Sequence, residues 1–304
     1  MVTASGGGGY DVRLDDGATV HAVLRGRLKQ EARTGDRVVI GDRVRVRPAE
    51  ASAPPDGPEG WVVEAIEPRR TQIVRRSVRE RRPKVVAANV DRMLAVVAAR
   101  APEPRLRQLD RLLVIAEANG VAPVVLVNKV DLPGGPEVAA RLSEVYRDAG
   151  YPVLAVSAHT GEGLEALRAR LSDGVSALVG VSGVGKSSIL NALAPGLDLR
   201  TGELSRGSRR GRHTTVRARL LPLPGGGMVA DTPGFGDVSV WGVPEDAVEA
   251  CFPEIQALAG GCRYRGCAHL AEPGCAVRDA IAEGRLAPSR WESYAALRGG
   301  PQEG

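Results

Sequence analysis

The stretch that decides the fold reads GVSGVGKS and runs from Gly180 to Ser187. It fits the pattern G-x-x-x-x-G-K-[ST], and it lies between a predicted strand and a predicted helix. Gly180, Gly183 and Gly185 let the backbone turn tightly, so that its N–H groups face phosphate oxygens at a helix N-terminus. Lys186 is expected to reach the β- and γ-phosphates, and the Ser187 hydroxyl to bind Mg²⁺. The predicted phosphate-binding set is Gly180, Val181, Ser182, Gly183, Val184, Gly185, Lys186, Ser187 and Ser188.

Strands and helices alternate around this loop. Strand-like stretches occupy residues 92–99, 123–128, 151–158 and 176–180, and two more occupy 218–223 and 227–231. Helix-like stretches occupy residues 105–119, 136–149, 163–171 and 186–194. This alternation predicts a parallel, doubly wound α/β sheet.

NKVD, residues 128–131, indicates which base is bound. Asp131 can accept hydrogen bonds from the guanine N1–H and exocyclic amine, whereas adenine presents the opposite pattern. Asn128 is expected to brace the loop, and the stem of Lys129 to lie along the base. A charged turn without a ligand is the alternative interpretation. The following VSAHTGEG favours guanine, because a backbone N–H at Ser157 or Ala158 can hold guanine O6.

Two further motifs suit the γ-phosphate and its metal ion. Asp231 opens DTPG at the end of an apolar strand, where a carboxylate for Mg²⁺ is expected, and the N–H of Gly234 can contact the γ-phosphate. RHTT, residues 212–215, lies where the first switch segment belongs. Thr214 or Thr215 is expected to complete the Mg²⁺ coordination with Ser187 and Asp231, and the sequence does not choose between them.

The C-terminal region carries the pattern Cys262-x4-Cys267-x-His269-x5-Cys275. Three thiolates and an imidazole form a closed tetrahedral Zn²⁺ site, so a structural role is expected rather than a catalytic one. Free buried cysteines beside a surface histidine are the alternative. Cys251 stands apart and is expected to be an ordinary core cysteine.

The N-terminal region looks different. Short strands broken by Gly, Asp and Pro between residue 10 and about residue 74 predict a small barrel, with an OB-fold the best candidate. The Gly-rich residues 1–9 and the residues 299–304 are expected to be disordered tails. The net charge is +5, and the basic residues concentrate at 69–84 and 200–219. Such stretches suit a polyanion such as nucleic acid, although a solvated arginine-rich surface is the alternative.

Nothing in the sequence resembles a membrane span or a secretion signal, so a cytoplasmic protein without membrane contact is expected. The order of the motifs is unusual for a GTPase. The guanine motifs NKVD and VSA precede the P-loop, and RHTT and DTPG follow it. All the parts are present, so the sequence predicts a circularly permuted GTPase.

This combination resembles the ribosome small-subunit-dependent GTPase A (RsgA/YjeQ) family. The stretches that carry the resemblance include GDRVRV, LDRLLVIAE, GVSGVGKSSILNAL, GRHTT and CRYRGCAHLAEPGCAVRDAI. It implies a multidomain protein with an OB-fold at residues 10–84, a circularly permuted P-loop GTPase at 85–240 and a mainly helical zinc-binding domain at 241–298.

The resemblance also implies partners and a reaction. Family members bind the small ribosomal subunit and its rRNA late in assembly, and they hydrolyse GTP to GDP slowly until the subunit stimulates them. Phe235 follows DTPG and cannot orient water. The family is proposed to use a switch histidine instead, which matches His213 here; contact with phosphate or RNA is the alternative role. A GTP-gated module acting on another RNA or on the large subunit is the alternative function, and a monomer is the default expectation.

Overall fold

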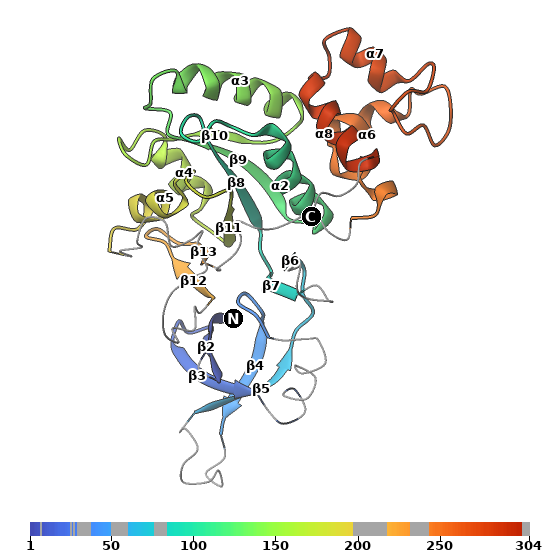
Figure 1. The fold of residues 1–304 in the computed structure, drawn as a ribbon. Coiled ribbons are helices and arrows are strands. Elements are labelled where there is room, and N and C mark those ends of the chain that lie inside the picture. The colour runs from blue at the N-terminus through green and yellow to red at the C-terminus, as the bar shows by residue number, and fades with distance from the viewer. Residues whose placement is uncertain are drawn as a thin grey trace, which may run out of the picture.

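The fold is described from a computed structural model (Figure 1). The structure describes residues 1–6, 8–24, 26, 28, 38–49, 60–75, 84–196, 218–231 and 243–299. Three regions follow one another along the chain: N-terminal strands, a central α/β region and a C-terminal group of helices. Among the described residues, no helix combines the length and the apolar character that a bilayer-spanning segment needs.

The central region is built on a largely parallel sheet. Its strands are β8 (Arg92–Ala98), β9 (Ala122–Asn128), β10 (Val153–Ala155), β11 (Val175–Val179), β12 (Arg219–Pro222) and β13 (Met228–Asp231). They lie in the order β10-β9-β8-β11-β13-β12, and all neighbours are parallel except β12, which runs antiparallel to β13. Six of the seven residues of β8 are buried, as expected for a strand covered on both faces.

Helices cover both faces of this sheet (Figure 1). The helices are α2 (Leu106–Ala118), α3 (Gly135–Asp148), α4 (Leu164–Arg170) and α5 (Lys186–Leu193). Alternate residues of β8 enter two separate cores, because successive strand side chains point to opposite faces. Met93 shares its core with residues of α2 and α3, whereas Leu94 shares its core with residues of α4 and α5. The predicted doubly wound α/β region is therefore confirmed, with helix ends within about two residues of those expected.

The sheet order places a crevice at the carboxyl ends of β8 and β11. From β8 the chain winds outward through β9 and β10, and it then returns to the other side of β8 as β11. Loops after these two neighbouring strands consequently diverge to opposite faces. Ligands of open α/β sheets bind at such a switch point. The P-loop follows β11, and NKVD follows β9 on the same edge.

The first strands differ from expectation. Residues 1–9 are not a tail, because Val2–Gly6 form β1 and β2 (Gly9–Arg13) begins at Gly9. Val2 is fully buried in a small core with Val12 and Val63. Val2 is therefore the one residue of β1 that is fully buried. The other residues of this strand are small, so the sequence pattern did not predict a strand here.

The N-terminal strands continue the large sheet and do not close on themselves. After β1 and β2 come β3 (Thr19–Leu24), β5 (Trp61–Ile66) and β4 (Val44–Pro48), in that spatial order. The expected closed barrel is not observed among the described residues. A strand has only two edges, and β1 uses one for β2 and the other for β12, where Ala4 is opposite Arg219. The apolar residues Val38–Ile40 form no strand, and Ile40 makes only an isolated bridge with Ala87.

A two-stranded sheet of β6 (Gln72–Arg75) and β7 (Lys84–Ala88) connects the N-terminal strands to the central region. The C-terminal region holds short helices: η3 (Glu245–Ala247), η4 (Glu249–Cys251), α6 (Pro253–Ala259), α7 (Ala276–Ala282) and α8 (Pro288–Gly299). Cys251 is buried as predicted, and desolvation raises the pKa of its thiol to about 11. Gly299, expected in a tail, is the last residue of α8, and residues 300–304 lie outside the described residues.

A buried ion network fixes α8 against the central region. The Arg290 guanidinium on α8 donates to Asp110 Oδ1 of α2 at 2.6 Å and to Glu254 Oε1 of α6 at 2.6 Å. The Tyr146 hydroxyl on α3 donates to the same Asp110 oxygen at 2.8 Å. Arg290 and Asp110 are 1% and 0% exposed, so the two charges depend on each other. The guanidinium also lies 4.6 Å from the centre of the Phe252 ring.

Asp110→Ala should destabilise the protein by about 3–5 kcal/mol, because it leaves the Arg290 charge buried with an incomplete set of partners. Asp148→Ala is the matched control, since it removes an exposed aspartate at the end of α3. Urea unfolding of both variants measures the difference. Identical unfolding midpoints for the two variants would show that this network does not hold the regions together.

Candidate nucleotide and metal sites

The P-loop connects β11 to α5. Its backbone passes so close to neighbouring residues that glycine is required at several positions. Gly183 and Gly185 have φ of 87° and 96°, a conformation that favours glycine. A side chain at Gly180 would collide with the carbonyl oxygen of Val96 at the end of β8. A side chain at Gly185 would collide with the Asn128 amide. The loop is therefore pressed against the ends of both β8 and β9.

Lys186 is held within this loop. It is only 4% exposed, and its ammonium donates to the carbonyls of Gly180 at 2.6 Å and Val181 at 3.0 Å. Ser187 is 6% exposed in the first turn of α5. The loop therefore holds a buried cation and a buried hydroxyl, the two groups that the sequence predicts to contact phosphate and Mg²⁺.

Asn128 connects the guanine-specific motifs to the P-loop. Its Nδ2 donates to the Val184 carbonyl at 2.8 Å, and its Oδ1 accepts from the Ala158 N–H at 3.2 Å. The side chain is 1% exposed, so both bonds form away from water. Three motifs from three loops therefore meet at one carboxamide. The bracing role expected for Asn128 has a definite geometry.

The remaining residues of the base-recognition motifs lie around Asn128, in the loops that follow β9 and β10. Lys129 has φ of 63°, and its ammonium donates to the carbonyl of Ala101. Partial burial lowers the pKa of Lys129, although the Asp131 charge works in the opposite direction. Asp131 itself is exposed at this edge and is accessible to a base. The Ser157 hydroxyl oxygen accepts the His159 and Thr160 N–H groups at 3.2 and 3.0 Å, which shapes the second guanine loop.

Asp231 is the last residue of β13, which is parallel to β11, so its carboxylate lies at the same edge of the sheet as the P-loop. Burial raises the pKa of Asp231, and Arg219, whose Nε lies 3.4 Å from Oδ2, opposes that rise. Ser187 and Asp231 offer the oxygen donors that Mg²⁺ prefers. The other predicted residues here, His213, Thr214, Thr215 and Gly234, lie outside the described residues.

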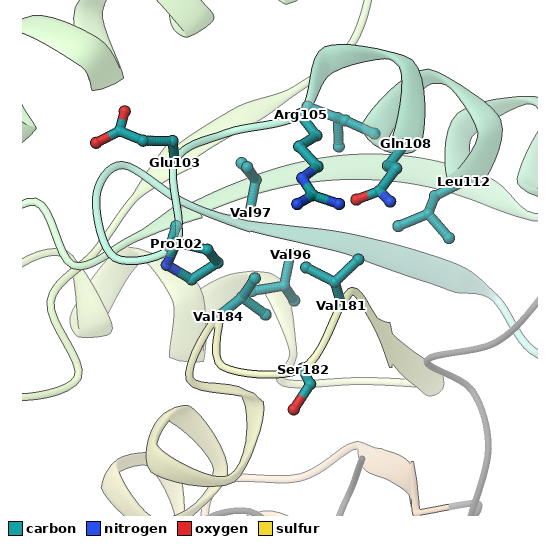
Figure 2. A pocket seen from close by; sticks show the side chains of 12 residues that line it. Val96, Val97, Pro102, Glu103, Arg105, Gln108, Leu112, Val181, Ser182 and Val184 are labelled. Atoms are coloured by element: carbon teal, nitrogen blue, oxygen red, sulfur yellow. The ribbon is translucent and has the colours of Figure 1, made fainter.

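A cavity of about 250 Å³ lies beside the P-loop (Figure 2). It is bounded by the end of β8, the start of α2 and the loop residues Val181, Ser182 and Val184. Arg105 and Gln108 extend into it from the start of α2 (Figure 2). None of Asn128, Asp131 and Ser157 lines it, so this cavity is distinct from the predicted base site.

The cysteine and histidine cluster is assembled as the spacing predicted. The ligand atoms of Cys262, Cys267, His269 and Cys275 all lie within 4.8 Å of one another. His269 Nδ1 is 3.4 Å from the Cys262 sulfur and 3.5 Å from the Cys275 sulfur. Burial, together with the neighbouring thiols, raises the pKa of Cys267 to about 12. The donor set fits a structural zinc ion.

Glu249 completes this site, and sequence spacing gave no sign of it. Its Oε2 lies 3.2 Å from His269 Nε2, on the side of the ring away from the thiols. A carboxylate in that position fixes the tautomer with Nδ1 free to bind metal and raises ligand basicity. Glu249 belongs to η4, which packs on α2, so the metal cluster is oriented from the central region.

A family model described as RsgA GTPase matches residues 66–241. The Small ribosomal subunit biogenesis GTPase RsgA of Gemmatimonas aurantiaca is 48% identical over 98% of this chain and 95% of its own length. The chain belongs to the RsgA family. The RsgA of Moorella thermoacetica is 43% identical over 94% of this chain and 92% of its own length.

Two solved structures agree with RsgA membership. YjeQ from Thermotoga maritima superimposes with a TM-score of 0.78 at 31% identity, covering 98% of this chain and 96% of that one. YloQ, described as a circularly permuted GTPase, gives 0.74 at 28% identity, covering 98% and 92%. The resemblance inferred from the motifs is thereby confirmed, as is the permuted GTPase fold.

Asn128→Ala should weaken GDP binding about 5- to 150-fold, because the change separates the P-loop from the guanine motifs and the loss of one buried hydrogen-bond partner costs about 1–3 kcal/mol. Asn119→Ala is the control, since Asn119 is a partly buried asparagine at the C-terminal end of α2, away from the P-loop. Titration calorimetry with GDP and Mg²⁺ measures the change. Equal dissociation constants for the two variants would show that Asn128 does not organise the site.

Glu249→Gln should lower zinc affinity about 10- to 100-fold, because an amide cannot supply the charge that supports the histidine ligand. Glu245→Gln provides the comparison, as it changes an exposed glutamate in the preceding turn. Competition with a chelator reports the affinity. The role assigned to Glu249 is wrong if both variants release zinc at the same chelator concentration.

Proposed function

We propose that this chain is a GTP hydrolase of small-subunit biogenesis: it binds GTP with Mg²⁺, acts on the small ribosomal subunit in the cytoplasm, and is stimulated by that subunit. The observation that carries the proposal is the Asn128 carboxamide, which joins the guanine motifs to the P-loop. The printed names of the curated relatives supply the biological setting.

Each residue has a proposed role in this reaction. Asp131 accepts hydrogen bonds from guanine, and Lys186 stabilises charge on the β- and γ-phosphates. Ser187 and Asp231, together with Thr214 or Thr215, would hold Mg²⁺, which neutralises the developing charge. Gly234 offers an N–H to the γ-phosphate. His213 is proposed to orient the attacking water, since Phe235 has no polar group.

The N-terminal strands are proposed to form an open OB-type domain that contacts rRNA. Five strands in the order β1-β2-β3-β5-β4, with β3 and β5 parallel, support a Greek-key arrangement of this type. Such a domain would begin at Val2 rather than at residue 10. The residues from 243 onward, with the four metal ligands, would form the zinc domain.

Steady-state GTP hydrolysis with and without purified small subunits tests the function. Small subunits should stimulate hydrolysis strongly, whereas large subunits and ATP should give only the basal rate. Equal stimulation by large subunits, or by any RNA, would favour the alternative of a GTP-gated module for another RNA.

Asp131→Asn provides an internal test of base recognition. An asparagine can donate to the carbonyl that xanthine carries in place of the guanine amine, so preference should change from GTP to xanthosine triphosphate. The exposed Asp148→Ala should keep the GTP preference. Unchanged preference in the Asp131 variant would place base recognition elsewhere.

A further inference from the structure

The loop between the first two metal ligands presents an unusual surface. Residues 263–266 read RYRG, and all four are exposed, while Cys262 and Cys267 fix the two ends of the loop. Tyr264 is 47% exposed, and among the described residues no other large hydrophobic side chain is classed as exposed. A single exposed apolar side chain is common on a protein surface, but here the exposed ring lies between two exposed arginines on a loop anchored at both ends.

The loop is closely packed on the side of Arg263. The Arg263 N–H donates to the Gly274 carbonyl at 2.9 Å, beside the metal ligand Cys275. Gly274 has φ of 70°, and a Cβ there would lie 3.1 Å from the Arg263 Cβ, so this side of the loop is closely seated. The Arg263 guanidinium lies 5.5 Å from the Tyr264 ring centre. The ring is therefore held near a cation before any partner binds.

The two arginines carry uncompensated charge. Among the described residues, neither Arg263 nor Arg265 has a carboxylate partner. Glu272 is the acidic residue nearest to Arg265 in the sequence. Its carboxylate is already bonded to backbone, because it accepts the N–H groups of Ala268 and Leu270 at 2.8 and 3.0 Å. Those backbone bonds, which also lower the pKa of Glu272 to about 2, use its carboxylate within the loop after His269.

We propose that Tyr264, between Arg263 and Arg265, is a stacking platform for an unpaired RNA base, with the two guanidiniums contacting the flanking phosphates. An aromatic face accepts a base of any sequence, and adjacent arginines neutralise the backbone. A single ring offers too little apolar area for a protein groove or a bilayer. The inference rests on the proposed function, since it assigns one contact with rRNA to a particular side chain.

The expected effect is specific to the ring. Tyr264→Ala should weaken binding to a single-stranded oligoribonucleotide and to small subunits about 5- to 150-fold at fixed salt. Tyr264→Phe keeps the ring and should bind like the unchanged protein. Duplex RNA should bind all three proteins alike, because its bases are not available for stacking. Fluorescence anisotropy with labelled RNA measures the constants.

The contribution of the two arginines is tested separately, through the salt dependence of RNA binding. Arg263→Ala or Arg265→Ala should reduce the slope of log affinity against log salt by about 1 for each phosphate that is no longer neutralised. Arg285→Ala is the matched control, because Arg285 is 54% exposed but pairs with Glu283 at 2.6 Å. Zinc content and basal GTP hydrolysis should be unchanged in every variant, which excludes unfolding of the metal site.

Each outcome decides the question. Equal RNA affinity of Tyr264→Ala and the unchanged protein would overturn the platform, and so would weaker binding to subunits but not to RNA, which would indicate a ribosomal protein as the partner. Failure of small subunits to stimulate the unchanged protein would instead count against the proposed function. In that case the oligoribonucleotide measurement would still test the platform.

Discussion

The Asn128 carboxamide is the contact on which the arrangement of the P-loop and the loops after β9 and β10 depends. It is buried, and its donor and its acceptor are both used, by Val184 and Ala158. A buried amide that lost either hydrogen bond would carry a large desolvation cost. Because one loop bonds the amide nitrogen and the other bonds the amide oxygen, the amide fixes the two loops relative to each other. Gly185 is part of the same constraint, since any side chain there would displace the amide.

This contact also explains why the order of motifs along the chain can change. The crevice depends on which strands are adjacent, and β11 lies beside β8 whatever the point at which the chain begins. Side chains that meet across the crevice are held by the sheet and by Asn128, not by the covalent sequence of loops. Permutation changes the segment that comes after the site: here the chain beyond β13 leads to the zinc region, which Arg290 fixes to α2.

The sequence predicted the elements that carry local signals. The P-loop glycines, NKVD and the cysteine spacing are each patterns within a few residues, and the structure brings Asn128 against the P-loop and gathers the three cysteines with His269. It also predicted the central strands, because long buried apolar runs are distinctive. It missed β1, where a single valine among small residues is the core contact, and β7, which follows a basic stretch.

Contacts between residues far apart in the sequence could not be predicted from local sequence patterns. Arg290 and Asp110 are separated by 180 residues, and an arginine on a helix is normally taken for a surface residue. Glu249 precedes its histidine by 20 residues and belongs to a different turn. The open N-terminal sheet was missed for a related reason, since only the fold shows that β12 occupies the edge needed for closure.

That shared edge has a mechanical consequence. Asp231 is opposite Arg219 in the ladder of β12 and β13, and Arg219 is in turn opposite Ala4 of β1. The Asp231 carboxylate, which is predicted to bind Mg²⁺, is thus connected to the first strand through two successive ladders, that of β13 with β12 and that of β12 with β1. A fusion partner or affinity tag joined before Val2 would be attached next to these pairings, so nucleotide turnover is better measured on protein that carries its tag at the other end.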